Sequence, residues 1–473
     1  MVEGAHTVAK GGTLEAAANL VDDPHVHKFR KSLGVWHVVG LAMADVSPTM
    51  AVLLLTAGVV SISGTFTVGA CLILSGIVVL IALCLGELAA RNPSAGGMYS
   101  IVKEVLPAPI AWITLLNYVL QGIVIPASLA LGIAIFLKDL FPGLGIPNEI
   151  IALVALLGAG LIALTRVEVG AWTTSIMVIV EVSVLGIITI AAVFNWNQDL
   201  VAITTRPVHL VDGNLVPVTF AVAITALAPA FNIINGYDAT LGFAEEMHDG
   251  SRHIGTTVVI AAILASLLIT IPFTAAVVAA PDLTAFLSNP APVVYSVEQA
   301  LGPLAKAIVD IGVIIALFNG ALSLIMYFAR GVFATGRDRL WPRAVNQRLG
   351  SLNGHGVPGW GVVALVVPAI PLVFLSQLDW LIIFAGTMIT AVYFCIGLAA
   401  LWSRIKDREG PRPFKMPFWP LPALIVTLFT GFALWQQETQ YIVGEVILAA
   451  AGLLLFLGSK FWAERAAPHA SRA

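Results

Sequence analysis

Charged residues are scarce in this 473-residue chain, where Asp, Glu, Lys and Arg together make up 11% of the sequence. A soluble globular protein carries about 25% charged residues, so this chain has too little polar surface to face water on all sides. Hydrophobic residues, by contrast, make up 59% of the chain. The composition therefore argues against soluble domains and predicts an all-α integral membrane protein.

A dominant sign of charge is also lacking, since 24 Lys and Arg nearly balance 27 Asp and Glu. A net charge of -3 gives no reason to expect a nucleic-acid partner. Cysteine is rare, and Cys71, Cys84 and Cys395 all lie inside apolar segments. An odd number of cysteines at such positions predicts neither a disulfide framework nor a metal site, and we interpret them as small core residues.

Several functional motifs are missing as well. The chain has no metal-ligand spacing and no glycine-rich phosphate loop, so we expect no cofactor and no ATP-driven mechanism. Residues 1–27 contain no apolar run followed by a cleavage site, which argues against a signal peptide. No accessory subunit is evident, because no cysteine outside the apolar segments is available to link one; the oligomeric state stays open.

Apolar segments are present along the whole chain, and a helix needs roughly 20 mostly apolar residues to cross a bilayer. We predict twelve spanning helices, near residues 35–60, 66–90, 109–137, 149–165, 169–194, 217–243, 256–280, 303–330, 359–376, 380–402, 418–435 and 441–462. If both termini are cytoplasmic, 21 of the 24 Lys and Arg lie on the cytoplasmic side and only Lys138, Arg206 and Lys306 lie outside. This positive-inside pattern supports an even number of spans in the cytoplasmic (inner) membrane, with both termini cytoplasmic.

The first segment carries an aspartate and a proline near its middle, in the stretch Ala44-Asp45-Val46-Ser47-Pro48. Pro48 cannot donate a backbone hydrogen bond, and Ser-Pro is also the pattern that begins a helix, with serine at the N-cap. We therefore predict two half-helices that meet near Asp45 to Ser47. A simple proline kink is the alternative.

The sixth segment is interrupted at a similar depth, in the stretch Phe231-Asn232-Ile233-Ile234-Asn235-Gly236-Tyr237-Asp238. Asn235 is a candidate cap of a second half-helix, with Asp238 in its first turn, where a negative charge suits the helix dipole. The alternative is that these polar residues pack against neighbouring helices. Interrupted segments at matching positions in two halves of five helices indicate an inverted-repeat transporter. Half-helix ends offer N–H groups to a carboxylate and C=O groups to an ammonium.

Four stretches at predicted helix boundaries resemble the amino acid–polyamine–organocation transporter family. They are Gly86-Glu87-Leu88 with Pro93-Ser94-Ala95-Gly96-Gly97-Met98-Tyr99, Gly236-Tyr237-Asp238 with Ala244-Glu245-Glu246-Met247, Arg330-Gly331-Val332-Phe333-Ala334-Thr335-Gly336-Arg337-Asp338-Arg339-Leu340-Trp341-Pro342, and Arg412-Pro413-Phe414-Lys415-Met416-Pro417. The resemblance implies two inverted repeats of five helices, with discontinuous helices one and six and two appended helices. The expected division is a tail at 1–31, a ten-helix core at 32–403, and helices eleven and twelve with a C-terminal tail at 404–473.

The resemblance also places the substrate at the two breaks, where the candidate binding residues are Ala44, Asp45, Val46, Ser47, Phe231, Asn232, Asn235, Gly236 and Tyr237. Two positions depart from the family pattern. Many relatives have a glycine-rich first break that binds the substrate carboxylate, whereas here Pro48 removes a donor and Asp45 adds a charge. Relatives often carry an aromatic gate where this chain has Asn232, so we expect the neighbouring Phe231 to serve instead.

Among the acidic residues within the predicted spans, two are candidates for coupling transport to protons. Glu181 lies near the centre of segment five, and a carboxylate there costs roughly 2.5–3.5 kcal/mol on insertion scales. It is either the proton-coupling group or a permanently neutral acid bonded to a neighbouring helix. Asp45 pairs with a substrate ammonium, titrates during transport, or caps free N–H groups at the break.

Together these features predict a secondary transporter that imports amino acids by alternating access, with proton symport as the expected coupling. An importer of amines or polyamines and an exchanger are the alternatives, because Asp45 favours a ligand with an ammonium group and the fold supports exchange. A channel or nutrient sensor on the same fold would not accumulate its ligand against a gradient. An intramembrane enzyme is disfavoured, since no nucleophile and base pair up in the sequence.

Overall fold

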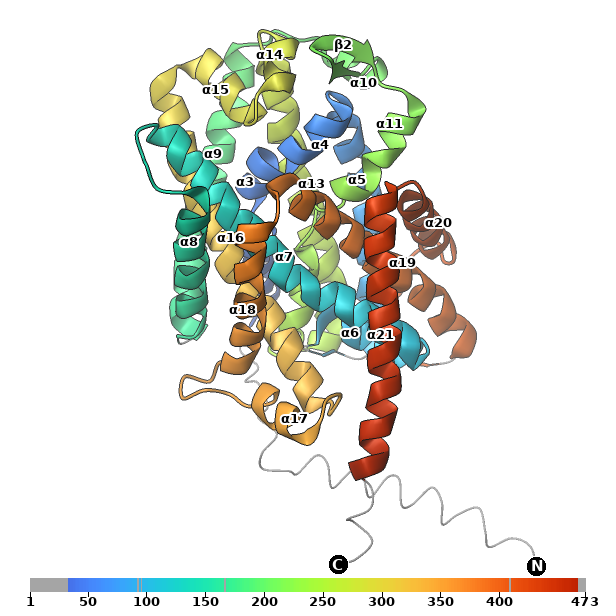
Figure 1. The fold of residues 1–473 in the computed structure, drawn as a ribbon. Coiled ribbons are helices and arrows are strands. Elements are labelled where there is room, and N and C mark those ends of the chain that lie inside the picture. Colours follow the sequence, from blue (N-terminus) through green and yellow to red (C-terminus); the bar gives the residue numbers. More distant parts are fainter. Residues whose placement is uncertain (1–32, 92, 95, 166, 408–409, 467–473) are drawn as a thin grey trace, which may run out of the picture.

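The computed structural model describes residues 33–91, 93–94, 96–165, 167–407 and 410–466. The N-terminal tail predicted at 1–31 and the last residues, 467–473, lie outside the described residues. The chain described is mostly helical, and Figure 1 shows long helices packed side by side into one bundle.

The first half of the bundle runs from the broken first helix to the long helix α9. Its helices are α2 (Val35–Val46), α3 (Pro48–Met50), the π-helix η1 (Ala51–Leu55), α4 (Thr56–Ser63), α5 (Phe66–Arg91), α6 (Gly97–Val105), α7 (Ala108–Leu140), α8 (Asn148–Ala163) and α9 (Val167–Phe194). The second half follows a short connecting region. Its helices are α11 (Phe220–Thr225), α12 (Leu227–Ala230), the 3₁₀-helix η2 (Tyr237–Phe243), α13 (Gly250–Ala279), α14 (Leu283–Ser288), α15 (Pro292–Leu301), α16 (Pro303–Arg337), α17 (Arg343–Leu349), α18 (Gly359–Leu375), α19 (Leu378–Lys406), α20 (Leu421–Trp435) and α21 (Thr439–Ala466).

In the described part of the chain, eight helical stretches are long and apolar enough to cross a membrane. They lie at Val35–Ser63, Phe66–Arg91, Ala108–Leu140, Ile176–Phe194, Gly250–Ala279, Pro303–Arg337, Leu378–Lys406 and Thr439–Lys460. The other four predicted segments contain shorter apolar helices, at Asn148–Ala163, Phe220–Ala230, Gly359–Leu375 and Leu421–Trp435. Every predicted segment therefore holds an apolar helix, and the fold is that of a multi-pass membrane protein.

One connection departs from the all-helical expectation. Helix α10 (Leu200–Thr205) is followed by strands β1 (Val208–Val211) and β2 (Asn214–Pro217), which pair antiparallel. The turn between them contains Asp212 and Gly213, both with positive φ, which is typical of a tight hairpin. The hairpin lies with α14 and α15 at one end of the bundle, and α17 lies at the other (Figure 1).

Helices α7 and α16 form the centre of the bundle and pack against each other, while α16 also contacts α9 and α18. Both central helices are largely buried. By contrast α21 packs mainly on α7 along one side of the bundle, and most of its surface is exposed. The broken helices α2–α4 and α11–η2 run through the inside of this arrangement, with α13 against both.

Candidate functional site

The first spanning helix is broken at Ser47, as the sequence predicted. Helix α2 ends at Val46, and Ser47 adopts a left-handed conformation with φ 40° and ψ 72°. Pro48 then begins α3, which continues through the π-helix η1. Non-glycine residues rarely take this backbone conformation, and π-helical turns often occur at functional sites. The helix is therefore interrupted and not merely kinked by Pro48.

Ser47 occupies the predicted N-cap position of α3, with Pro48 in the first turn, but its side chain makes no cap hydrogen bond. Its hydroxyl lies 2.8 Å from Glu181 Oε2 and 3.1 Å from the backbone oxygen of Ala316 on α16. Asn319, also on α16, donates from Nδ2 to Glu181 Oε1 at 2.8 Å. The Ser47 hydroxyl therefore bonds to the buried carboxyl of Glu181 on α9 instead of capping the half-helix.

The second break lies between α12 and η2, where residues 231–234 form a turn and residues 235–236 have no regular secondary structure. Gly236 has φ 97° and stands at the N-cap position of η2. This corrects the expectation that Asn235 is the cap. The Asn235 side chain instead accepts from the Gly236 N–H at 2.8 Å and from the Tyr393 hydroxyl at 3.1 Å.

The two breaks touch each other at Gly236. A Cβ placed on Gly236 would lie 2.8 Å from the Val46 nitrogen and 3.0 Å from the carbonyl carbon of Asp45. Glycine is required here for two reasons, since its φ is positive and the α2 backbone leaves no room for a side chain. Sequence positions almost two hundred residues apart thus form one junction of irregular backbone.

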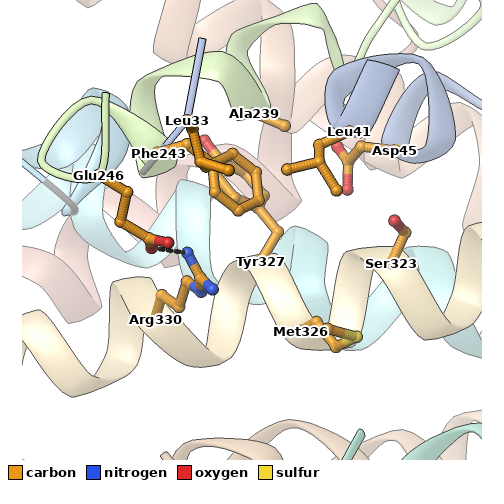
Figure 2. Close-up of a pocket in the computed structure, with 10 residues that line it drawn as sticks. All are labelled: Leu33, Leu41, Asp45, Ala239, Phe243, Glu246, Ser323, Met326, Tyr327 and Arg330. Carbon is orange, nitrogen blue, oxygen red and sulfur yellow. Dashed lines mark hydrogen bonds and ion pairs between the residues drawn. The ribbon is translucent and has the colours of Figure 1, made fainter. Parts of the chain in front are cut away.

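A small cavity of about 110 Å³ begins at this junction. Figure 2 shows Asp45 at one end of it and the ion pair of Arg330 and Glu246 at the other, with the Tyr327 ring between them. Asp45 is 4% exposed, and its Oδ1 has no hydrogen-bond partner among the described residues. Buried polar atoms normally have a hydrogen-bond partner. A donor group on a bound ligand would supply the partner that Asp45 Oδ1 lacks.

A second buried carboxyl lies beside the first. Asp238 in η2 is close enough to Asp45 for their charges to repel each other, and it is 3% exposed. Its Oδ2 accepts from the Tyr327 hydroxyl at 3.2 Å, while its Oδ1 has no partner within the described part of the chain. Two acidic groups with free acceptor atoms therefore face the same junction.

The cavity is closed at its far end by charged residues that the sequence placed at helix ends. Arg330 Nη1 lies 2.6 Å from Glu246 Oε1, and the guanidinium stacks 4.6 Å from the Phe243 ring centroid. The Leu33 N–H, just before α2, donates to the backbone carbonyl of Glu246 at 3.0 Å. These contacts connect the residues just before α2 to those just after η2 at this end of the cavity.

Glu87 anchors the segment after α19 in a separate ion-pair cluster. It accepts from Arg404 Nε at 2.7 Å, from Arg412 Nε at 3.1 Å and from the Met416 N–H at 2.7 Å. Nearby, the Arg91 guanidinium holds the pKa of the Asp407 carboxyl below its ordinary value. Glu87, Glu245 and Glu246, all from the family motifs, each form an ion pair.

The predicted site residues separate into three groups in the structure. Asp45 lines the cavity, and Ala44 and Val46 are buried beside it. Ser47 joins Glu181. The third group turns toward α19: Phe231 and Tyr237 contact the Tyr393 ring at centroid distances of 5.7 and 6.3 Å, and Asn232 donates to the Ile382 carbonyl at 3.3 Å. Phe231 does not line the cavity, so the cavity offers no support for its expected gating role.

Sequence reasoning missed the contribution of two helices far along the chain. Ser323, Met326 and Tyr327 on α16 line the cavity, and Tyr393 on α19 holds Asn235. The α16 residues are three and four positions apart, which places them on one helix face. This spacing is the sequence feature that could have identified them as a group. No group of three or more His, Cys, Asp or Glu side chains suited to a metal occurs among the described residues.

Comparisons with known proteins identify relatives of the chain. The family model described as amino acid permease matches residues 33–456, which is most of the chain. A branched-chain amino acid permease, BcaP of Lactococcus lactis subsp. cremoris (strain MG1363), is 32% identical over 208 residues, covering 40% of this chain and 43% of that permease. A low-affinity putrescine importer, PlaP of Escherichia coli (strain K12), is 23% identical over 394 residues, covering 79% of this chain and 81% of that importer.

Proposed function

The chain belongs to the amino acid permease family, and we propose that it is a proton-coupled secondary transporter that imports amino acids by alternating access. The observation that carries this proposal is the hydrogen bond from Ser47, where the first helix breaks, to the buried carboxyl of Glu181. A titratable group that holds an irregular backbone junction can link protonation to helix movement. Transporters and not enzymes are the chain's relatives.

We propose a topology of twelve spans, of which the first ten form two inverted repeats of five. The breaks at Ser47 and Gly236 support this topology, because they fall in the first segment of each half. Helices α20 and α21 are then the appended pair. The arginines near α17 and after α19 support a cytoplasmic position for that end of the bundle by the positive-inside rule, and we propose that both termini lie on the same side.

The substrate's ammonium is proposed to bind the free Oδ1 of Asp45, since a charge-assisted hydrogen bond is the strongest that this atom can accept. The substrate's carboxylate is then expected at the first-turn N–H groups of η2, at whose start an anion is favoured. Pro48 weakens the corresponding site on α3, because it has no N–H. The closed ion pair of Arg330 and Glu246 must separate to release substrate toward α17.

The proton is proposed to bind Glu181, and its surroundings suit both protonation states. When Glu181 is ionised, the Ser47 hydroxyl donates to Oε2. When Glu181 is protonated, it donates to the Ser47 oxygen, and Ser47 donates to the Ala316 carbonyl 3.1 Å away. One proton thus moves the hydrogen bond of the break from α9 to α16. If Glu181 were permanently neutral, only the arrangement in which Ser47 donates to the Ala316 carbonyl would occur.

An amine importer is the second candidate, and the pair of Asp45 and Asp238 favours it. Both carboxyls keep an acceptor atom without a partner in the described chain, which suits a ligand with two ammonium groups. A thermal-shift panel that compares ornithine with putrescine, its decarboxylated product, separates the candidates. A ligand at a hundredfold excess over its Kd stabilises the folded state by about 2.7 kcal/mol. Stabilisation by amino acids alone supports the first proposal, and stabilisation by amines alone overturns it.

Transport itself is tested in proteoliposomes with an acid-outside pH gradient. A symporter accumulates substrate above the external concentration, and collapse of the gradient stops the accumulation. An exchanger requires substrate on the inside for any uptake, and a channel never passes equilibrium. Either of these last two results would overturn proton symport.

A further inference from the structure

A second cavity lies on the side of the bundle, where α7, α19, α20 and α21 meet, and has a volume of about 410 Å³. Its walls are almost entirely apolar and include Ile113, Phe394, Leu434 and Val446. Helix α21 forms its outer edge, and most of that helix is exposed on the side of the bundle (Figure 1). In a membrane this groove is reached from the bilayer and not from water.

Two polar groups face this apolar groove. Asn117 on α7 is 1% exposed, and Glu445 on α21 lies beside its amide. The Asn117 Nδ2 donates to the Ile113 carbonyl of its own helix at 3.3 Å. Asn117 Oδ1 and Glu445 Oε1 have no hydrogen-bond partner among the residues that the structure describes. One oxygen on each of these two side chains therefore lacks a donor within the described part of the chain, although the Asn117 amide also bonds to Glu445.

A carboxyl within a spanning segment is costly and marks a functional site whose partner should be sought. The substrate site does not supply that partner, because the cavity at Asp45 is lined mainly by α2, η2 and α16 and shares no lining residue with the groove. A donor with a positive charge satisfies both oxygens, and an apolar body fills the remaining walls. A primary ammonium has three N–H groups, enough for both acceptors.

We propose that this groove binds an apolar primary amine, with its ammonium between Glu445 and Asn117 and its hydrocarbon part along α7 and α19. The groove is connected to the transport junction through α19. Tyr393, which donates to Asn235 at the second break, directly precedes Phe394 and Cys395 in the groove wall. Because the groove shares no lining residue with the cavity at Asp45, its ligand is distinct from the transported substrate.

The test uses the purified full-length protein in lipid nanodiscs, with decylamine as the probe and decanol at the same mole fraction as the uncharged control. Decylamine is expected to raise the Tm by at least ~3 °C more than decanol does, since it alone carries the charge. Glu445→Gln should abolish this difference. Glu438→Gln, an exposed carboxylate just before α21, should retain it, as should Asp45→Asn.

A further variant guards against misfolding of Glu445→Gln. Ala449→Phe fills the groove from α21 and leaves Glu445 in place, so it should also lose the decylamine effect. Equal shifts with decylamine and decanol would overturn the proposal and indicate a protonated Glu445 that donates to Asn117. An undiminished decylamine shift in both groove variants would overturn it too, because the amine would then act through the bilayer or another site.

Discussion

The two breaks share a backbone irregularity but differ in what holds them. Each has a left-handed residue next to a buried acid: Ser47 follows Asp45 by two positions, and Gly236 precedes Asp238 by two. The first break is held by Glu181, a group that can gain or lose a proton. The second is held by the Tyr393 hydroxyl, which stays neutral in ordinary conditions.

This difference assigns separate tasks to the two breaks. The Asn235 side chain at the second break is held by a neutral hydroxyl. In the proposed mechanism, the first break changes its hydrogen bonds when Glu181 changes charge. We therefore regard the first break as the part that senses the proton and the second as the fixed part against which it moves.

The largest expected effect comes from removing the contact between the breaks. Gly236→Ala places a methyl group 2.8 Å from the Val46 nitrogen and imposes strain at φ 97°. We expect a loss of ~3 kcal/mol or more of unfolding free energy and no measurable uptake. The unfolding midpoint and the yield of folded protein in detergent measure this.

A matched control exists in the hairpin. Gly213 also has a positive φ, 78°, but no atom lies within 4 Å of the position that a Cβ would take there. Gly213→Ala should cost only about 1 kcal/mol and leave uptake intact. Similar losses in the two variants would mean that backbone strain alone, and not contact between the breaks, explains Gly236.

The next largest effect distinguishes the two acids. Asp45→Asn should weaken substrate binding by about 10- to 150-fold, because a hydrogen bond to a charged group contributes roughly 1.5–3 kcal/mol. Asp238→Asn should weaken the binding of an amino acid less than Asp45→Asn does. It should weaken the binding of a diamine by as much as Asp45→Asn does. Competition binding with ornithine and putrescine measures both. An Asp45→Asn protein with unchanged affinity would remove Asp45 from the substrate site.

The sequence predicted the positions of the breaks well because their causes are local. Pro48 and Gly236 determine the backbone conformation at their own positions, so their effect could be predicted without knowing which residues pack around them. Ser47 does stand at the predicted N-cap, but its side chain bonds to Glu181 instead of capping the helix. The cap expected at Asn235 was wrong, because Gly236 takes that position and Asn235 bonds to Tyr393. Asn319, Tyr327 and Tyr393 act through helix packing that no local pattern encodes. Apolar periodicity could locate the helices that carry these residues, but it could not predict which face of each helix points toward the site.

Ser47→Ala sharpens the comparison by cutting the link between Glu181 and the break. We expect a modest loss of stability, about 1 kcal/mol, and a weaker response of uptake to the pH gradient. Thr49→Val is the matched control, because Thr49 donates to the backbone oxygen of Glu181 at 2.9 Å and not to its carboxyl. An equal loss of pH response in both variants would show that general packing, and not the carboxyl, is responsible.

The smallest effect is expected at the fixed break. Tyr393→Phe removes the hydroxyl that donates to Asn235 but keeps the ring contacts with Phe231 and Tyr237. We expect a cost of about 0.5–1.5 kcal/mol and a pH dependence of uptake like that of the unchanged protein. A shifted pH profile in this variant would contradict the division of tasks between the breaks.

The central claim is that Glu181 carries the coupled proton. The most direct test is to record proton and substrate uptake together in proteoliposomes that contain either the unchanged protein or Glu181→Gln, which keeps the size of the side chain but cannot ionise. The account predicts that the unchanged protein takes up protons with substrate, whereas the variant moves substrate down its gradient without protons. Proton uptake that continues with substrate in the Glu181→Gln protein would contradict it.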